Sequence, residues 1–334
     1  MKTPVLVTAK EYEKGRDIFV ETFDGADALE IQPAEAGESV LAERVRQTAA
    51  RMVIVGVDRY CGELYPALAG GLIARFGVGY DGIDRKLCLE HKIVVTSTPG
   101  ALTRSVTEHA IWLMGCLARN VARTDRRMHQ NDYRPECGEE LFEKNLLIVG
   151  FGQIGRDVAR IAGGAFGVTI RAFDCAPLTE AAGAEGLDLA DFLKKYHLQT
   201  YTADIEPALA WANIVSVHMA ANDQTRHFFN NSLFGCFRKG AMFINTSRGS
   251  VVDERALYHA LSDGRLAGAA LDVFENEPYR PVSPDCDLRK LENVVLTPHI
   301  GSNTSASNRR MASMCLENCR NFLAGKLDRL TRVI

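Results

Sequence analysis

Long apolar runs, a strong excess of one charge and paired cysteine motifs are all absent from this sequence of 334 residues. No apolar stretch approaches the length that a bilayer requires, and the N-terminus lacks the charged-then-apolar pattern of a secretory signal. The formal net charge is only −3, which argues against nucleic acid or an anionic membrane as the main partner. We therefore predict a cytoplasmic protein whose partners are small molecules and other protein chains.

The nine cysteines are scattered and include no C-x-x-C pair. Cys315 and Cys319 share one face of an expected helix, but no histidine or third cysteine lies near them in the sequence. Buried thiols are therefore expected there rather than a metal site. A hydrophobic content of 46% and a charged content of 24% are ordinary for a globular protein, and the length allows two domains.

A glycine-rich turn between an expected strand and an expected helix is the most informative motif. The apolar run Leu146–Val149 is followed by the G-x-G-x-x-G sequence of residues 150–155, after which apolar residues recur at helical spacing. A second apolar run, Val168–Phe173, ends on Asp174, nineteen residues after the last glycine. Strand, glycine turn, helix, second strand and terminal acid together predict a dinucleotide-binding site.

Each residue of this motif has a physical task in such a site. Gly150 allows the tight turn, Gly152 lets the backbone approach a pyrophosphate, and Gly155 permits close packing of helix on strand. The N–H groups at the helix start, around Gln153 and Ile154, suit an anion. Asp174 is expected to accept hydrogen bonds from the ribose hydroxyls and to repel a 2′-phosphate, which favours NAD(H) over NADP(H).

The rest of the chain alternates strands and helices, which predicts an α/β fold with open parallel sheets. One long helix is expected from about 105 to 129 and a terminal helix at 305–323, while Asp253 is a candidate N-cap. Before residue 100 we expect strands at 5–8, 28–32, 52–55, 72–76 and 93–96 and helices at 12–21 and 40–49; after Asp174 we expect strands at 199–202, 214–217, 241–245, 267–274 and 293–297 and helices near 189–196, 205–212 and 254–263.

Charged side chains follow three of these later strands. Arg248 comes after the strand at 241–245, Glu277 after the strand at 267–274, and His299 after the strand at 293–297. Ligands of an open parallel sheet bind beyond the carboxyl ends of its strands. A guanidinium pairs with a substrate carboxylate, and a histidine beside a carboxylate is favoured in its charged form. Next to a nicotinamide, this set suits hydride transfer to a 2-oxo acid.

The blocks LLIVGFGQIGR, NTSRGSVVDERAL, GAALDVFENEP and LTPHIGSNT resemble the signature blocks of the NAD-dependent D-isomer-specific 2-hydroxyacid dehydrogenases. That family includes phosphoglycerate dehydrogenase and the hydroxypyruvate and glyoxylate reductases. The resemblance implies that His299 protonates the C2 oxygen during reduction, that Glu277 keeps His299 charged, and that Arg248 holds the substrate carboxylate. It implies substrate binding by Arg75, Val78 and Gly79 and places Thr98, Thr107, Gln153, Ile154, Asp174, His218, Thr246, Asp272 and Gly301 along the NAD(H) cofactor, beside the motif glycines Gly150, Gly152 and Gly155.

The resemblance also implies an architecture. A Rossmann domain for NAD, residues 104–300, is expected to be inserted into a flavodoxin-like substrate domain made of residues 1–103 and 301–334. The family dimerises through its cofactor domain, so we expect a homodimer whose contact includes the long helix after Ser105.

Three features depart from the family pattern. The family usually has His-x-Pro after the fourth cofactor strand, whereas this chain has His218-Met219-Ala220. The segment between Asp174 and His218 is longer than usual, and the sequence assigns no role to the extra length. The sequence ends soon after its last helix, so the serine-sensing regulatory domain of some phosphoglycerate dehydrogenases is expected to be absent.

The substrate and one other class of function stay open. The stretches TRSVTEH and CLARN favour the phosphoglycerate branch of the family. Against this, Arg59 and Arg75 are the only candidate partners for a substrate phosphate, which normally requires several donors. Phosphoglycerate, hydroxypyruvate and glyoxylate are therefore all retained; formate dehydrogenase fits less well, because that relative replaces the catalytic glutamate. The alternative is a non-enzymatic NAD-sensing protein of the C-terminal-binding-protein corepressor type, which retains the same arginine, glutamate and histidine.

Overall fold

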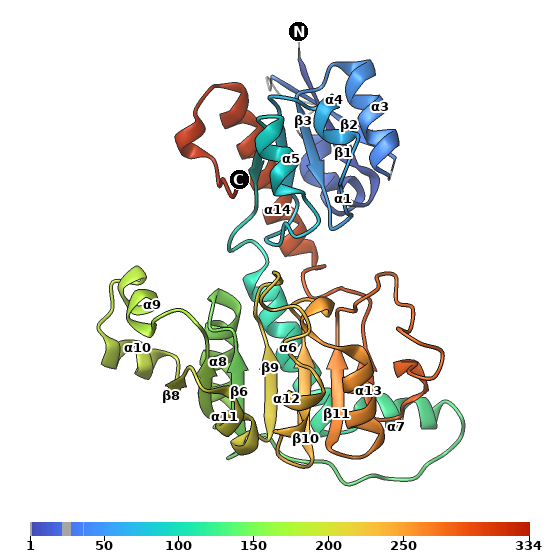
Figure 1. Ribbon diagram of the computed structural model, residues 1–334, viewed down its shortest axis with the longest axis vertical. Helices are drawn as coiled ribbons and strands as arrows, with labels where there is room; N and C mark the ends of the chain where they lie inside the picture. Colours follow the sequence, from blue (N-terminus) through green and yellow to red (C-terminus); the bar gives the residue numbers. More distant parts are fainter. Residues whose placement is uncertain (1, 22–27, 36) are drawn as a thin grey trace. The chain divides into compact units, whose positions relative to one another are not determined.

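The computed structural model describes residues 2–21, 28–35 and 37–334. The chain divides into two compact units, which are coloured along the sequence in Figure 1. One unit, here called the split unit, runs to Leu102 and resumes at Ser302; the other, the inserted unit, is Thr103–Gly301. Within the described ranges, no helix combines the length and the apolar character needed to cross a membrane.

The split unit is built on a sheet of five parallel strands in the order β2-β1-β3-β4-β5. This is the flavodoxin-like strand order, which confirms the predicted fold class. Strands β3 and β4 are buried along their whole length, since helices cover both faces of a parallel sheet. The strands are β1 (Thr3–Thr8), β2 (Leu29–Ala34), β3 (Met52–Val55), β4 (Leu72–Arg75) and β5 (Val94–Thr96).

The helices of the split unit differ from the prediction at one point. The single helix expected at 12–21 is wrong, because the chain forms two short helices on either side of Gly15. A Cβ at Gly15 would lie 2.6 Å from a ring carbon of Phe19 and 2.8 Å from the Cβ of Ala312, so the chain passes too close for any side chain. The helices are α1 (Ala9–Lys14), α2 (Arg16–Glu21), α3 (Glu38–Thr48), α4 (Leu64–Ala67), α5 (Arg85–Glu90), α14 (Ser305–Leu323) and the 3₁₀ turn η3 (Leu327–Arg329).

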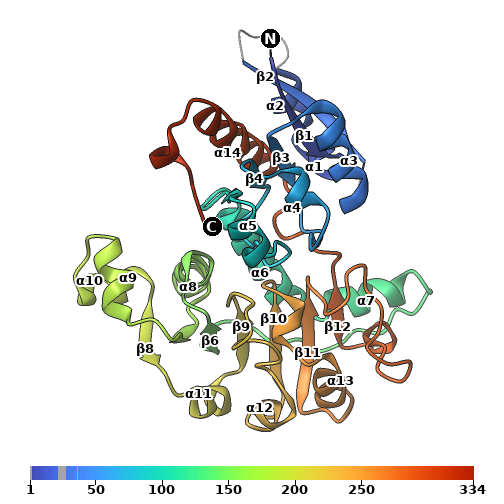
Figure 2. The same cartoon turned by 45° about the horizontal axis from the view of Figure 1, so that its top comes forward.

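Helix α14 returns the chain to the split unit and lies beside strand β4 (Figure 2). Cys315 and Cys319 on this helix are completely buried, which confirms the buried thiols predicted there. The two short helices α4 and α5 were not predicted. Helix α5 did carry a signal, since the Asp84 side chain accepts hydrogen bonds from the N–H groups of Lys86 and Leu87 as an N-cap.

The inserted unit is built on a sheet of seven parallel strands in the order β12-β11-β10-β9-β6-β7-β8. The order reverses between the neighbours β6 and β9, which makes the crevice beyond their carboxyl ends the expected ligand site. This doubly wound sheet confirms the predicted Rossmann architecture. The strands are β6 (Asn145–Val149), β7 (Thr169–Phe173), β8 (Leu198–Thr202), β9 (Ile214–Val217), β10 (Ala241–Asn245), β11 (Leu266–Leu271) and β12 (Val294–Leu296).

Helices cover both faces of this sheet and bury a separate apolar cluster on each. Alternate residues of β6 enter different clusters: Leu146 and Ile148 pack on the side of α6 and α8, and Leu147 and Val149 on the side of α11 to α13. The helices are α6 (Thr103–Ala118), α7 (Val121–Met128), α8 (Gln153–Phe166), α9 (Leu178–Ala184), α10 (Leu189–Lys195), α11 (Ile205–Trp211), α12 (Asn231–Gly235) and α13 (Glu254–Ser262), with 3₁₀ turns η1 (Gly249–Val251) and η2 (Leu288–Lys290).

Two boundaries in the inserted unit correct the sequence prediction. The long helix expected at 105–129 is wrong, because Asn120 adopts a left-handed conformation with φ of 54° and separates α6 from α7. The strand expected at 267–274 ends at Leu271, so Asp272 lies beyond the strand and not within it. The predicted N-cap is confirmed: the Asp253 side chain accepts hydrogen bonds from the N–H groups of Arg255 and Ala256.

Stability of the inserted unit depends on an aromatic group under α12. The ring of Phe229 is fully buried and lies 5.1 to 6.2 Å from the rings of Phe234, Phe237 and Phe243.

We expect Phe229→Ala to lower the free energy of unfolding by about 3–5 kcal/mol, measured by urea denaturation, because it leaves a cavity that these rings fill incompletely. Leu323→Ala is the control, since Leu323 is 42% exposed. Equal effects of the two substitutions would contradict this assignment of the core.

Candidate active site

Three neighbouring strands of the inserted unit deliver the predicted reactive side chains to one edge of the sheet. Strands β10, β11 and β12 pair in parallel, so their carboxyl ends meet at the same edge. Arg248, Glu277 and His299 follow these three strands in turn. The structure therefore gathers the three loops that the sequence pointed to.

His299 and Glu277 form a direct pair. The Nδ1 atom of His299 lies 2.7 Å from Oε2 of Glu277, while Oε1 of the same carboxylate accepts a hydrogen bond of 3.0 Å from the N–H of Phe274. Both carboxylate oxygens are thus engaged, which fixes the orientation of the imidazole through Nδ1. The two side chains are 28% and 31% exposed, so the pair is not sealed inside the inserted unit.

The backbone of His299 has an uncommon conformation. Its φ is 53°, in the left-handed region that non-glycine residues seldom adopt. Its N–H donates to the carbonyl oxygens of Asp272 and Thr297 at 2.9 and 3.0 Å, which holds the loop in this conformation. Sparsely populated backbone conformations of this kind concentrate at functional sites, where the surrounding structure enforces them.

Asp272 is the residue that enforces this loop. Its carboxylate is only 2% exposed and accepts hydrogen bonds from the hydroxyl of Thr297 at 2.6 Å and from the N–H groups of Ile300 and Gly301 at 2.9 and 2.8 Å. Burial acts to raise the pKa of Asp272, but these bonds and the nearby His109 ring outweigh it and lower the pKa. The carboxylate is therefore a charged anchor for the His299 loop.

The sequence interpretation placed Asp272 and Gly301 along the cofactor, and the structure shows them bonded to each other. His109, at 3.4 Å from the Asp272 carboxylate and 3.1 Å from the Thr297 hydroxyl, completes this network. No local motif identified His109, because its partners follow strand ends more than 160 positions away in the sequence.

Arg248 stands on a loop that is held by the residue ending strand β10. The side-chain oxygen of Asn245 accepts hydrogen bonds from the N–H and the hydroxyl of Ser247, and its amide nitrogen donates to the carbonyl of Arg248 at 2.9 Å. A Cβ at Gly249 would overlap the backbone carbonyl of Phe274, so this loop packs directly on the loop that carries Glu277. The sequence interpretation did not select Asn245, whose role depends on this loop geometry.

The glycine loop has the close approaches that its motif predicts. Gly150 has a φ of 93°, and a Cβ there would lie 2.6 Å from the N of Met219 and 2.7 Å from the carbonyl carbon of His218. A Cβ at Gly155 would overlap the carbonyl oxygen of Gly150, which confirms the tight packing of α8 on the turn. At Gly152, by contrast, a Cβ would meet no atom within 4 Å.

The start of helix α8 therefore has open space beside it. Gly152 is the N-cap and supplies no side chain to the first N–H groups of the helix, including those of Gln153 and Ile154. Open space, uncapped N–H groups and the positive end of a helix fit a pyrophosphate. Thr107 and Thr246 add buried hydroxyls that have no hydrogen-bond partner among the described residues.

Two further residues fit the rest of a dinucleotide. The Oδ2 atom of Asp174 accepts a hydrogen bond of 2.6 Å from the N–H of Phe151, and Oδ1 accepts one of 3.2 Å from the N–H of Ala176, which leaves lone pairs on both oxygens for ribose hydroxyls. Burial lowers the pKa of His218 to about 3, so its imidazole is neutral and contacts the Ser216 hydroxyl at 2.9 Å.

The other predicted site residues belong to the split unit. Arg75 is buried and donates a hydrogen bond to the carbonyl of Phe76. Gly77 has a φ of 142° and its carbonyl accepts a hydrogen bond from the N–H of Thr98, whose own hydroxyl is buried without a partner among the described residues. The half-buried Val78 and Gly79 follow on the same loop.

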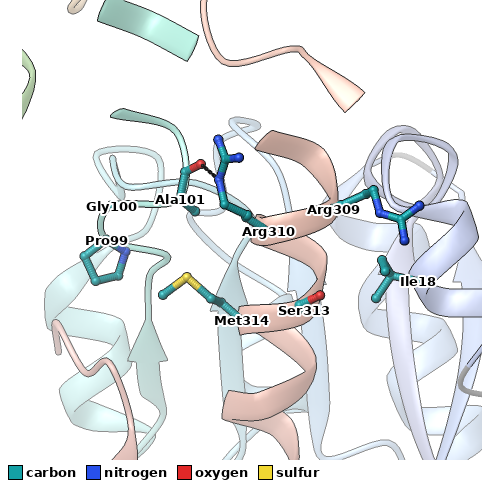
Figure 3. Close-up of a pocket in the computed structure, with 8 residues that line it drawn as sticks. All are labelled: Ile18, Pro99, Gly100, Ala101, Arg309, Arg310, Ser313 and Met314. Carbon is teal, nitrogen blue, oxygen red and sulfur yellow. Dashed lines mark hydrogen bonds between the residues drawn. The ribbon is translucent and has the colours of Figure 1, made fainter. Parts of the chain in front are cut away.

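The split unit also contains a cavity of about 460 Å³ (Figure 3). In the close-up, Arg310 on helix α14 reaches the carbonyl oxygen of Ala101 through its Nε atom at 2.7 Å. None of the predicted site residues lines this cavity. Its lining consists of Ile18, Pro99, Gly100, Ala101, Arg309, Arg310, Ser313 and Met314.

A second carboxylate pair lies behind the Glu277 loop. Oε1 of Glu254 accepts a hydrogen bond of 2.6 Å from the N–H of Glu275, and Oε1 of Glu275 accepts one of 3.1 Å from the N–H of Glu254. His227 contacts the other oxygen of Glu275 at 2.9 Å. Burial, followed by the charges of Glu275 and Glu277, raises the pKa of Glu254 to about 7. This pair was not predicted, since Glu254 and Glu275 belong to different elements.

The Rossmann sheet, the open helix start and the histidine–carboxylate pair at one sheet edge define a dinucleotide-dependent dehydrogenase. Residues 111–301 match the family described as D-isomer specific 2-hydroxyacid dehydrogenase, NAD binding domain. The chain is 35% identical to the glyoxylate reductase of Korarchaeum cryptofilum, over 98% of this chain and 95% of that protein. The chain therefore belongs to the D-isomer-specific 2-hydroxyacid dehydrogenases, enzymes that transfer hydride between NAD(H) and 2-hydroxy acids.

Two other relatives agree with this assignment. Chloroplastic D-3-phosphoglycerate dehydrogenase 2 of Arabidopsis thaliana is 34% identical over 98% of this chain, which spans 49% of that protein. The structure of D-lactate dehydrogenase from Aquifex aeolicus with NAD and lactic acid superposes with a TM-score of 0.80 at 26% identity, over 97% of this chain and 96% of that one. The predicted family, enzyme class and NAD cofactor are confirmed, and these relatives give no support to the corepressor alternative.

The raised pKa of Glu254 predicts a specific dependence of stability on pH. In the unfolded chain a glutamate ionises near pH 4.5, whereas in the folded protein Glu254 ionises near pH 7. Between these values the folded state binds the extra proton, so this group makes the protein less stable as the pH rises, by on the order of a few kcal/mol in total.

We expect Glu254→Gln to remove this loss of stability with rising pH, because glutamine retains an oxygen that accepts from the N–H of Glu275 and cannot ionise. Denaturant unfolding of both proteins from pH 4.5 to 8 measures the effect. The variant should match the native protein at pH 4.5 and become progressively the more stable of the two up to pH 7. A stability difference that does not change with pH would contradict a folded pKa near neutrality.

Proposed function

We propose that this enzyme reduces small, unphosphorylated 2-oxo acids of the glyoxylate and hydroxypyruvate type with NADH, through Arg248, Glu277 and His299. The observation that carries the proposal is the His299–Glu277 pair, 2.7 Å apart, in which the second carboxylate oxygen is fixed by the N–H of Phe274. This arrangement orients the imidazole through Nδ1 and leaves Nε2 to face a substrate.

The reaction divides among these residues as follows. When bound, NADH supplies a hydride to C2 of the oxo acid. His299 donates the Nε2 proton to the C2 oxygen, and Glu277 orients the imidazole through Nδ1 for this transfer. Arg248 pairs with the substrate carboxylate, since a guanidinium offers two parallel donors to it. Water reaches the partly exposed imidazole and restores its proton after each turnover.

The state of the two arginines predicted as phosphate partners favours unphosphorylated substrates. Of the two arginines that the sequence offered as phosphate partners, Arg59 is exposed, and Arg75 is buried and donates to the carbonyl of Phe76. A phosphate dianion requires several such donors. The similar glyoxylate reductase of Korarchaeum cryptofilum agrees with this choice.

The two units divide the binding in this proposal. We assign the inserted unit to the cofactor, because it holds the open helix start, the Thr107 and Thr246 hydroxyls and Asp174. The fixed carboxylate of Asp174 favours NAD(H), since a 2′-phosphate would meet a like charge there. The split unit binds substrate through the N–H groups of Val78 and Gly79, which glycines allow to face an anion, together with Arg75.

A cytoplasmic homodimer completes the proposal. Large apolar side chains are exposed on the inserted unit at Trp112 (70%), Tyr133 (83%) and Phe142 (61%), on α6 and on the segment that follows α7. Exposed aromatic surface of this kind marks a protein interface, and a second copy of the chain is the proposed partner. The scattered cysteines, with Cys88, Cys286 and Cys315 buried as thiols, agree with a reducing cytoplasm.

The proposed function is tested by following NADH oxidation with glyoxylate, hydroxypyruvate, 3-phosphohydroxypyruvate and pyruvate. We expect the highest kcat/KM with glyoxylate or hydroxypyruvate. His299→Ala should lower kcat by roughly 10²- to 10⁴-fold, because it removes the proton donor. His259→Ala, on α13, is the control and should retain activity. Preference for the phosphorylated acid would reject the proposed substrate class, and full activity of His299→Ala would reject the proton donor.

A further inference from the structure

The extra length between Asp174 and His218 forms a structural element with a definite neighbour. It contains helices α9 and α10 and strand β8, drawn in yellow-green at one edge of the inserted sheet in Figure 1. Its aromatic residues Phe192, Tyr196 and Tyr201 surround the ring of Phe151, which is the second residue of the glycine motif. Their ring centres lie 6.4, 6.0 and 6.4 Å from that of Phe151, each edge-on. We call Phe192, Tyr196 and Tyr201 the aromatic bracket of Phe151.

The bracket holds one donor of the Asp174 carboxylate. Phe151 is only 3% exposed and Phe192 is fully buried, so the Phe151 side chain has little freedom. The N–H of Phe151 donates to Oδ2 of Asp174 at 2.6 Å. Packing on the ring of Phe151 therefore fixes the position of the donor that orients this oxygen.

The bracket also holds the donor of the other carboxylate oxygen. The N–H of Ala176 donates to Oδ1 of Asp174 at 3.2 Å, and the carbonyl of Ala176 accepts a hydrogen bond from the hydroxyl of Tyr201. Burial and the charge of Asp174 raise the pKa of Tyr201 to about 12, so this hydroxyl remains a donor at any working pH. Both oxygens of Asp174 are thus oriented through residues that the bracket contacts.

A salt-bridge group fastens the bracket to helix α8. Glu185, at the end of α9, accepts hydrogen bonds from the Tyr196 hydroxyl at 2.8 Å and from Nζ of Lys195 at 2.7 Å. It also pairs with Nε of Arg156 on α8 at 3.1 Å. Burial acts to raise the pKa of Glu185, but these partners outweigh it and lower the pKa, so the carboxylate stays charged. The added helices are therefore anchored to the element that begins at the glycine loop.

We propose that the aromatic bracket positions the carboxylate of Asp174 and thereby sets the discrimination between NAD(H) and NADP(H). The proposal rests on the proposed role of Asp174 as the ribose acceptor. A carboxylate that is free to turn accommodates a 2′-phosphate by moving away from it. A carboxylate that is held at both oxygens continues to accept hydrogen bonds from the ribose hydroxyls, and its negative charge continues to repel a 2′-phosphate. Phe192, Tyr196 and Tyr201 are positioning residues in this scheme, since they act through Phe151 and Ala176.

Tyr201→Phe is the most selective test, because it removes one hydroxyl and retains the ring. We expect the dissociation constant for NADH, measured by fluorescence titration, to rise about threefold to tenfold, as for the loss of one hydrogen bond. The constant for NADPH should change less, so the ratio of the two affinities falls, while kcat at saturating NADH stays unchanged. Phe192→Leu, which weakens the packing on Phe151, should act in the same direction. Tyr258→Phe on α13 is the matched control and should leave both constants unchanged.

A double substitution identifies the route of the effect. If the bracket acts through Asp174, Tyr201→Phe should change the NADH/NADPH ratio in the native background and leave it unchanged in the Asp174→Ala background. An unchanged ratio in Tyr201→Phe, or an equal effect in both backgrounds, would overturn the proposal for the bracket while the role of Asp174 stands. An unchanged ratio in Asp174→Ala alone would overturn both the bracket and the proposed cofactor preference.

Discussion

The buried carboxylate of Asp272 is the interaction on which the candidate site depends. Its two oxygens receive the Thr297 hydroxyl and the N–H groups of Ile300 and Gly301, which closes the loop after β12 around a single charge. The loop then presents His299 with a backbone conformation that it would not adopt alone. Loss of the Asp272 carboxylate would leave its three hydrogen-bond donors without an acceptor, and loss of the donors would leave a buried charge unsatisfied. The loop conformation is therefore stable only when the carboxylate and its donors are all present.

The other parts of the site are held by close approach of backbones. Gly249 brings the Arg248 loop onto the loop that carries Glu277, and Gly150 brings the cofactor turn against His218 and Met219. A side chain at either glycine would force these loops apart, so the alignment of neighbouring loops at the sheet edge requires residues without a Cβ. The sequence His218-Met219-Ala220 departs from the expected His-x-Pro pattern and makes this contact through the backbone of Met219.

The features that the sequence predicted are those determined by local chemistry. The glycine motif, the buried parallel strands and the charged residues after strand ends are recognisable from neighbouring positions alone. The structure forms the two parallel sheets and pairs His299 with Glu277. The break at Asn120 was missed because nothing in the local pattern requires a left-handed asparagine there. The His109–Asp272 contact, the Glu254–Glu275 pair and the aromatic bracket join residues far apart in the sequence, so only the tertiary structure reveals them.

The central claim is that His299, oriented by Glu277, gives the proton to the C2 oxygen of a 2-oxo acid whose carboxylate Arg248 holds. A crystal structure of the protein with NAD⁺ and oxamate, an unreactive analogue of a 2-oxo acid, tests it most directly. We predict an oxamate oxygen within hydrogen-bond distance of Nε2 of His299, Nδ1 still paired with Glu277, and the oxamate carboxylate on the guanidinium of Arg248. Oxamate bound away from His299, or bound with its carboxylate turned toward the imidazole, would contradict the account.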